Sequence, residues 1–286
     1  MSPVIARPFL ARLEDLLADG QRKLLGLVGP PGGGKSTLAQ ALLAALPGRA
    51  VVVPMDGFHL ANAELSRLGR AERKGAPDTF DNAGYVALLR RLKAQQADEI
   101  VYAPAFRREI EEAVAGAIAV EPRVPLVITE GNYLLLEVAH WAGVREQLDE
   151  VWFVDTDDEL RRNRLMQRHI RFGRTPQAAR EWVARTDEPN ARLVAASRHR
   201  ADVQFRWDGA IELAGPQRSS LRLGMSAPRR EQVMAAARAA KASADSSSAP
   251  DSASSADADS MPCSASQVSR AAWKVSPAPT VSMTST

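Results

Sequence analysis

The run from Gly29 to Ser36, Gly-Pro-Pro-Gly-Gly-Gly-Lys-Ser, is the segment of this 286-residue chain that points most clearly to chemistry. It matches the pattern G-x-x-x-x-G-K-[ST] in full, directly after an apolar run and at the start of a helix-forming segment. Glycines let backbone N–H groups curve around an oxyanion, and the helix N-terminus adds partial positive charge. The pattern therefore predicts a binding site for the phosphates of ATP or GTP.

The residues of this loop are expected to take separate roles. Lys35 is expected to reach the β- and γ-phosphates, and the Ser36 hydroxyl is expected to ligate Mg²⁺. The sequence has no N-K-x-D signature, which a GTPase would need to bind guanine. The loop alone leaves open whether the chain is a kinase or an ATPase. The other residues expected to bind the nucleotide are Gly29, Gly32, Gly33, Gly34 and Thr37.

Two carboxylates follow apolar runs that are expected to be strands. Asp56 comes just after the run at 51–54, and Glu130 ends the run at 126–129. Ligands of a parallel sheet bind beyond the carboxyl ends of its strands, so both side chains are expected near the phosphate loop. Asp56 is a candidate base for an acceptor hydroxyl, and Glu130 a candidate Mg²⁺ ligand through water. The alternative at both Asp56 and Glu130 is a structural role in a turn. His59 nearby is either a substrate contact or a structural histidine.

An arginine-rich helix is expected to follow the fourth strand. Arg161, Arg164 and Arg168 are spaced i, i+3 and i+7, so they are expected to share one helix face. Guanidinium groups in a line are suited to closing over phosphates and to neutralising charge in the transition state. Arg164 and Arg168 are therefore candidate catalytic residues, with a solvated face as the alternative. The loop at 172–174 is expected to belong to a lid.

The elements that must position these residues are those of an α/β fold. Continuous β-branched runs indicate strands buried on both faces, hence a mainly parallel sheet with helices on each side, as in the three-layer fold of P-loop NTPases. Strands are expected at 24–28, 51–54, 126–129, 151–154 and 203–207. Helices are expected at 9–18, 36–46, 84–95, 134–148, 158–169, 176–185 and 189–197.

Composition divides the chain into three parts. Residues 1–214 hold 29 basic and 29 acidic side chains, so a nucleic-acid-binding surface is not expected on this domain. Residues 215–241 are expected to be a linker with a short helix. Residues 242–286 contain 14 Ser and 10 Ala and are expected to be disordered. The single cysteine, Cys263, excludes an intrachain disulfide, and no apolar stretch approaches the length of a membrane span, so a cytoplasmic protein is expected.

The order of the motifs resembles the phosphoribulokinase / uridine kinase / type I pantothenate kinase superfamily, over residues 20–207. It is most similar to small bacterial members described as nucleoside/nucleotide kinase-like or fructose-transport-associated kinases. The resemblance implies ATP and Mg²⁺ as cofactors and a small molecule with a hydroxyl group as acceptor. It does not decide whether the chain forms a homodimer. The segments that carry it are the phosphate loop and residues 55–59, 73–81, 130–133, 161–169, 187–194 and 197–202.

The resemblance also implies an acceptor crevice between Asp56, the loop at 74–81 and a loop at 102–108. Related kinases tend to have an aromatic residue followed by Asp and then Arg in the last of these loops, where this chain has Arg107 in place of the Asp and Arg108 as expected. For Asp187 an N-cap is an equally good interpretation. The substrate-binding residues implied are His59, Lys74, Phe80, Tyr102, Arg108, Asn132, Asp187 and Asn190.

The sequence therefore favours an ATP-dependent kinase for a nucleoside, a sugar or a pantothenate-like alcohol. The alternative is a regulatory or transport-accessory protein that binds nucleotide and has no acceptor substrate. The charge reversal at Arg107 is the sequence feature that favours it. A nucleic-acid-acting ATPase is disfavoured by the neutral domain.

Overall fold

The structure, a computed structural model, describes residues 5–206. The expected linker at 215–241 and the expected disordered segment at 242–286 lie outside the described residues, as does the last residue of the strand expected at 203–207. Among the helices of residues 5–206, none has both the length and the apolar character that crossing a membrane requires.

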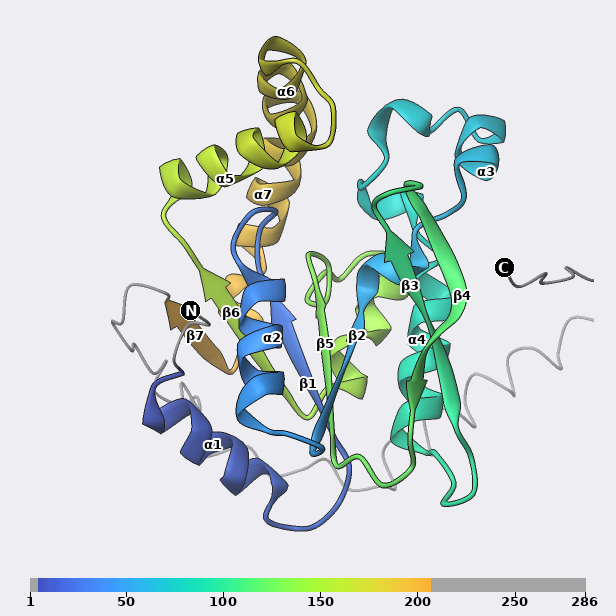
Figure 1. Cartoon of the computed structure of the whole chain (residues 1–286), viewed down its shortest axis with the longest axis vertical. Helices are drawn as coiled ribbons and strands as arrows, with labels where there is room; N and C mark the ends of the chain where they lie inside the picture. The colour runs from blue at the N-terminus through green and yellow to red at the C-terminus, as the bar shows by residue number, and fades with distance from the viewer. Residues whose placement is uncertain (1–4, 207–286) are drawn as a thin grey trace, which may run out of the picture. The chain divides into compact units, whose positions relative to one another are not determined.

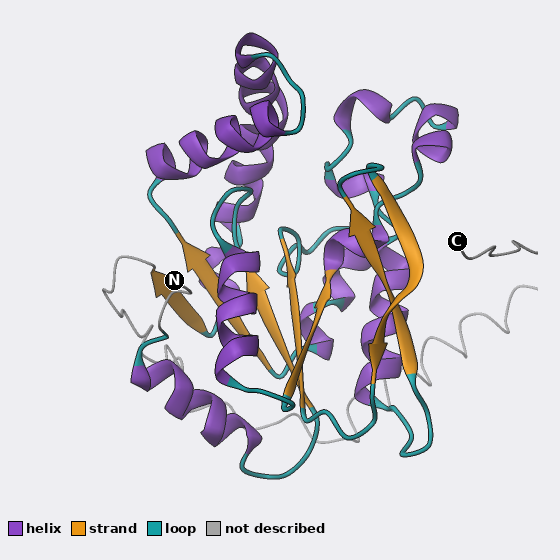
Figure 2. Ribbon diagram, viewed as in Figure 1, coloured by secondary structure: helices purple, strands orange, loops and turns teal. Residues whose placement is uncertain are grey.

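A five-stranded sheet, parallel throughout, forms the centre of the fold (Figures 1 and 2). Its strand order is β2-β5-β1-β6-β7. The register aligns Leu27 of β1 and Pro54 of β2 with Glu130 of β5, so the ends of these three strands meet at one edge. All five expected strands are confirmed: β1 Lys23–Val28, β2 Ala50–Pro54, β5 Leu126–Gly131, β6 Glu150–Asp155 and β7 Val203–Arg206.

Helices cover both faces of this sheet because successive apolar side chains of each strand point to opposite sides. On one face, α1 (Arg7–Leu17) and α2 (Lys35–Ala45) pack against side chains such as Leu25 and Leu27. On the other face, α4 (Asn82–Lys93) and α7 (Glu188–Ala196) join a second core with Leu24 and Val28. The alternation along β1 thus produces the three-layer α/β fold that the sequence predicts.

The remaining helices gather beyond the carboxyl ends of the strands. Figure 1 shows α5 (Asp158–Arg171) and α6 (Pro176–Trp182) on one side of this end and α3 (Asn62–Arg67) on the other. Thr175 caps α6, since its hydroxyl accepts the backbone N–H of Ala178. One turn of π-helix at Val183–Asp187 joins α6 to α7.

Two expectations for residues outside the sheet are wrong. The helix expected at 134–148 is replaced by two 3-10 turns, Ala139–Gly143 and Arg145–Gln147, because Ala139 has φ 48° and interrupts any helix. The apolar residues that suggested it, such as Trp141, fill the core behind the sheet instead.

The loop expected at 102–108 belongs to a strand. β3 (Val101–Arg107) pairs with β4 (Glu112–Val120) as an antiparallel hairpin separate from the main sheet. Its inward residues Val101, Ala103 and Val120 are buried in the core that contains α4. Alanine and glycine in β4 hide the alternation by which such a strand is recognised.

Candidate active site

The phosphate loop follows β1 and ends at the start of α2, where it was expected. Gly32 and Gly34 have φ of 77° and 90°, a left-handed conformation that favours glycine. A Cβ at Gly29 would lie 2.6 Å from the carbonyl oxygen of Val154, and one at Gly32 would lie 2.8 Å from that of Arg161. The loop is therefore closed tightly against β6 and α5, with little tolerance for side chains at these positions.

Lys35 places a buried ammonium group inside this loop. Its Nζ donates to the carbonyl oxygens of Gly29 (2.9 Å) and Pro30 (3.1 Å) and to Oδ1 of Asn132 (2.7 Å). Burial lowers the pKa of Lys35 to about 8, against the opposing charges of Glu130 and Asp56. All three hydrogen-bond acceptors are neutral, so a polyphosphate would supply the negative charge that they lack.

The groups expected to hold a metal ion contact each other at the end of β5. The Ser36 hydroxyl donates to Oε1 of Glu130 at 2.9 Å. Burial raises the pKa of Glu130, and the nearby charge of Asp56 acts in the same direction. Residues 5–206 contain no cluster of three metal-binding His, Cys, Asp or Glu side chains. Mg²⁺ needs only one or two protein oxygens besides phosphates and water, so this pair fits it.

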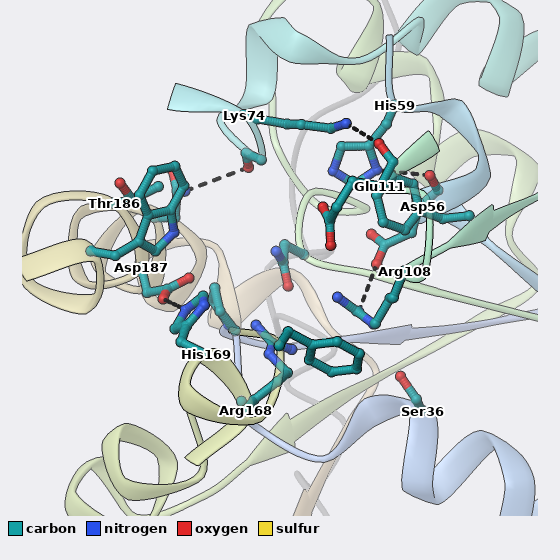
Figure 3. A pocket seen from close by; sticks show the side chains of 18 of the residues that line it. Ser36, Asp56, His59, Lys74, Arg108, Glu111, Arg168, His169, Thr186 and Asp187 are labelled. Carbon is teal, nitrogen blue, oxygen red and sulfur yellow. Dashed lines mark hydrogen bonds and ion pairs between the residues drawn. The ribbon is translucent and has the colours of Figure 1, made fainter. Parts of the chain in front are cut away.

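A cavity of about 490 Å³ extends from the phosphate loop across the carboxyl ends of the strands (Figure 3). It brings together residues that are far apart in the sequence, from the phosphate loop and the start of α2, the segment after β2, the hairpin β3–β4, β5 and the helices α5 to α7. The expected site residues that line it are Gly32, Lys35, Ser36, Asp56, His59, Lys74, Phe80, Arg108, Glu130, Asn132, Arg168, Asp187 and Asn190.

Asp56 and His59 lie together on the hairpin side of this cavity. Oδ2 of Asp56 faces Nη2 of Arg108 at 3.6 Å, an ion pair that leaves the carboxylate one-third exposed to the cavity. His59 donates from Nδ1 to the carbonyl oxygen of Asp56 at 2.7 Å. This contact fixes its ring between the rings of Phe80 and Phe106, with ring centres 4.0 Å and 4.6 Å away. Burial lowers the pKa of His59. The histidine therefore has a structural role and also lines the cavity.

The arginines of α5 do not act as one set. Arg168 lines both the large cavity and a second one of about 480 Å³ beside the phosphate loop, and Arg164 lines the second together with Gly32, Gly34 and Thr37. Arg161 is 1% exposed and forms ion pairs with Asp158 (3.0 Å) and Glu188. The expectation that it shares the open face is wrong, because this guanidinium ties α5 to the start of α7.

The positions of three side chains decide further expectations about Tyr102, Asp187 and Arg107. Tyr102 is 56% exposed on β3 and is not among the residues that line either cavity. Asp187 caps no helix with its side chain, and its Oδ2 accepts from Nε2 of His169 at 2.8 Å. Arg107 is exposed and lines neither cavity. The charge reversal at Arg107 therefore does not reach the site.

Other cavity residues were missed by reasoning from the sequence. Phe106 alternates with the exposed Arg107 along β3, so the period of a strand would have placed it inside. The guanidinium of Arg174 lies 3.9 Å from the centre of the Trp182 ring, at the end of α6. Nothing in the sequence signals the contact of His169 with Asp187, since these two residues are 18 positions apart in the chain.

Several of the proteins that are similar to this chain are named as kinases. A Schizosaccharomyces pombe protein named "Putative uridine kinase C227.14" is 36% identical over 194 residues, which are 64% of this chain and 82% of that protein. A pantothenate kinase of Limosilactobacillus reuteri subsp. reuteri is 30% identical over 151 residues, 51% of this chain and 48% of that enzyme. The solved structure of a "putative fructose transport system kinase" from Silicibacter sp. TM1040 is 38% identical, with TM-score 0.60 over 68% of this chain and 98% of its own. No protein-family model matches the chain.

Proposed function

The chain belongs to the phosphoribulokinase / uridine kinase / type I pantothenate kinase superfamily of P-loop kinases, and we propose that it transfers the γ-phosphate of Mg-ATP to a hydroxyl group of a small metabolite. The observation that carries this proposal is the position of Asp56. Its carboxylate lines the same cavity as Lys35, Ser36 and Glu130, on the side opposite the lid helix α5. A carboxylate there can accept the proton of a hydroxyl that attacks the terminal phosphate.

The phosphate end of the site consists of Lys35, Ser36 and Glu130. Backbone N–H groups of the loop and the Lys35 ammonium would hold the β- and γ-phosphates, and the Ser36 hydroxyl and Glu130 carboxylate would hold Mg²⁺. Mg²⁺ held by these residues would neutralise negative charge on the β- and γ-phosphates. Asn132, which now accepts from Lys35, would be released toward the acceptor when the phosphates take its place.

The lid side would supply the remaining positive charge. Arg168 is half-buried between the two cavities, and no carboxylate of residues 5–206 lies within ion-pair distance of it. Its guanidinium can therefore pair with the transferring phosphoryl group, while Arg164 can reach the nucleotide phosphates from the second cavity. Closure of α5 and α6 would exclude water, so that ATP is not hydrolysed.

The proposal is tested with the Asp56→Asn variant. Purified full-length chain with Mg-ATP should release ADP when an acceptor is added, and the variant should lose this release while it binds ATP with an affinity within a few-fold of the wild type. The amide keeps the size of the carboxylate but cannot take the proton. Normal turnover by Asp56→Asn would show that the base assignment is wrong.

A further inference from the structure

Lys74 is a half-buried cation on the acceptor side of the large cavity. Its Nζ donates to Oδ1 of Asn62 at 2.6 Å and to the carbonyl oxygen of Glu111. Both acceptors are neutral, and within residues 5–206 no carboxylate oxygen lies within 4.0 Å of this ammonium. Burial lowers the pKa of Lys74, and the charges of Glu112 and Glu111 only partly oppose the shift. Lys74 thus keeps a third N–H donor and a positive charge that the carboxylates of Glu112 and Glu111 offset only in part.

The local backbone is arranged to hold Lys74 in this place. Glu111 has φ 53°, an uncommon conformation for a residue with a side chain, and it turns its carbonyl oxygen toward both Lys74 and the side-chain amide of Asn62 (3.3 Å). The backbone N–H of Asn62 donates to Oε1 of Glu112 at 3.0 Å. These contacts tie α3 and the segment after it to the tip of the hairpin β3–β4, with the ammonium at the junction.

The ring of Phe106 contacts a second cation, the guanidinium of Arg108, on the same side of the cavity. The Lys74 ammonium lies 5.2 Å from the centre of the Phe106 ring, and the Arg108 guanidinium lies 6.0 Å from it. The His59 ring also contacts the Phe106 ring, with its plane tilted by 43°. Figure 3 shows Lys74, His59, Asp56 and Arg108 grouped on one side of the cavity, facing Arg168 and the pair of His169 with Asp187.

The carboxylates of this cavity do not neutralise Lys74. Asp56 faces Arg108, Glu130 accepts from Ser36, and Asp187 accepts from His169. The carboxylates of Glu112 and Glu111 attract the ammonium without forming an ion pair with it, and they offset its charge only in part. A half-buried charge without a direct ion-pair partner is costly, so a ligand that supplies an anion here gains affinity.

We propose that the acceptor is itself an anion: a small hydroxy compound whose phosphate or carboxylate group is bound by Lys74, with Arg108 beside it, while its hydroxyl faces Asp56. The inference rests on the proposed kinase function and narrows its substrate class, because an uncharged nucleoside or sugar would leave Lys74 without a direct ion-pair partner. Phosphate and carboxylate share the required chemistry, and the experiment below distinguishes them.

The first measurement uses anion binding and needs no catalysis. The full chain is saturated with Mg²⁺ and the non-hydrolysable ATP analogue AMP-PNP, so that all three nucleotide phosphate positions are filled. Inorganic phosphate and acetate are then titrated separately by calorimetry. We expect saturable binding of at least one anion, and the tighter of the two identifies the anionic group of the acceptor.

Two variants assign that binding. Lys74→Met should weaken anion binding by about tenfold, because a charge-assisted hydrogen bond is lost, while the affinity for AMP-PNP stays the same and shows that the variant is folded. Lys93→Met is the matched control: it makes the same chemical change at the exposed end of α4, where Lys93 faces Asp149 at 3.3 Å, and should leave anion binding unchanged. Absence of saturable binding in the wild type, or equal affinity in Lys74→Met, overturns the inference.

The second measurement compares matched acceptors in the ADP-release assay: glycerol against glycerate and glycerol 3-phosphate, and ribose against ribonate and ribose 5-phosphate. The inference expects a higher kcat/KM for an anionic member, and a KM for it that rises about tenfold in Lys74→Met with little change in kcat. Preference for the neutral members would contradict the inference and leave the kinase function standing. Failure to bind AMP-PNP would overturn the proposed function, and the inference with it.

Discussion

The buried ammonium of Lys35 predicts that nucleotide affinity depends on pH in a range where few other groups titrate. With a pKa of about 8 in the free chain, Lys35 is about nine-tenths protonated at pH 7 and about one-tenth protonated at pH 9. A bound polyphosphate favours the charged form and raises this pKa, so binding takes up a proton above pH 8. Affinity must then fall as the pH rises.

The size of the effect follows from those fractions. If only the ammonium form binds the phosphates strongly, the affinity for Mg-ADP falls about tenfold between pH 7 and pH 9, or roughly 1.4 kcal/mol. Calorimetry from pH 7 to 9.5, in buffers of different ionisation enthalpy, gives both the affinity and the number of protons taken up. Working above pH 7 avoids the titration of the nucleotide phosphate itself.

A matched variant makes this prediction refutable. Lys35→Met should bind Mg-ADP more weakly at pH 7 and show little change with pH, since the titrating group is gone. A flat profile in the wild type would show that Lys35 does not titrate near pH 8. The same slope in wild type and Lys35→Met would assign the pH dependence to another group.

Three further variants test separate parts of the site and fold. Asp56→Asn should lower kcat at least 100-fold in steady-state ADP release and leave the Kd for ATP within a few-fold; an equal loss of affinity would assign Asp56 to binding. Glu130→Gln should raise the Mg²⁺ concentration for half-maximal activity by about tenfold, whereas an unchanged Mg²⁺ titration would argue against a role in metal binding. Arg161→Met should lower the free energy of unfolding by about 3 kcal/mol, because Glu188 loses its buried partner. Arg164→Met, at an exposed residue, should change this free energy by less than about 0.5 kcal/mol. Urea unfolding measures both variants, and equal effects would contradict the structural role of Arg161.

The central sheet and the phosphate loop could be predicted because their signals are local. Each strand is a short continuous apolar run, and the glycines and the lysine of the phosphate loop all lie between Gly29 and Lys35. Asp56 and Glu130 were placed correctly near the loop because the carboxyl ends of parallel strands meet at one edge, which is a rule of topology.

The failures have a different physical origin. The segment 134–148 is apolar enough for a helix, but the positive φ of Ala139 and the burial of Trp141 depend on the core that it fills. The environment of Lys74 depends on a carbonyl group 37 residues away, that of Glu111. Side-chain spacing cannot specify such contacts, because they form only once the hairpin has been placed against α3.

Arg161 shows the same limit on one helix. Its spacing from Arg164 and Arg168 is correct for a shared face, yet Glu188 and Asp158 hold it in the core. Three arginines at helical spacing can therefore differ completely in burial, and only the tertiary partners decide which of them remain available to phosphates.

The most direct test of the proposed function is acceptor-stimulated ADP release by the purified full chain with Mg-ATP, with mass spectrometry of the acceptor. The panel contains nucleosides, sugars, sugar phosphates, hydroxy acids and pantothenate. The proposal predicts strong stimulation by one class and an acceptor heavier by one phosphoryl group. A flat panel from a chain that calorimetry shows to bind ATP would contradict it and favour a nucleotide-binding regulatory protein.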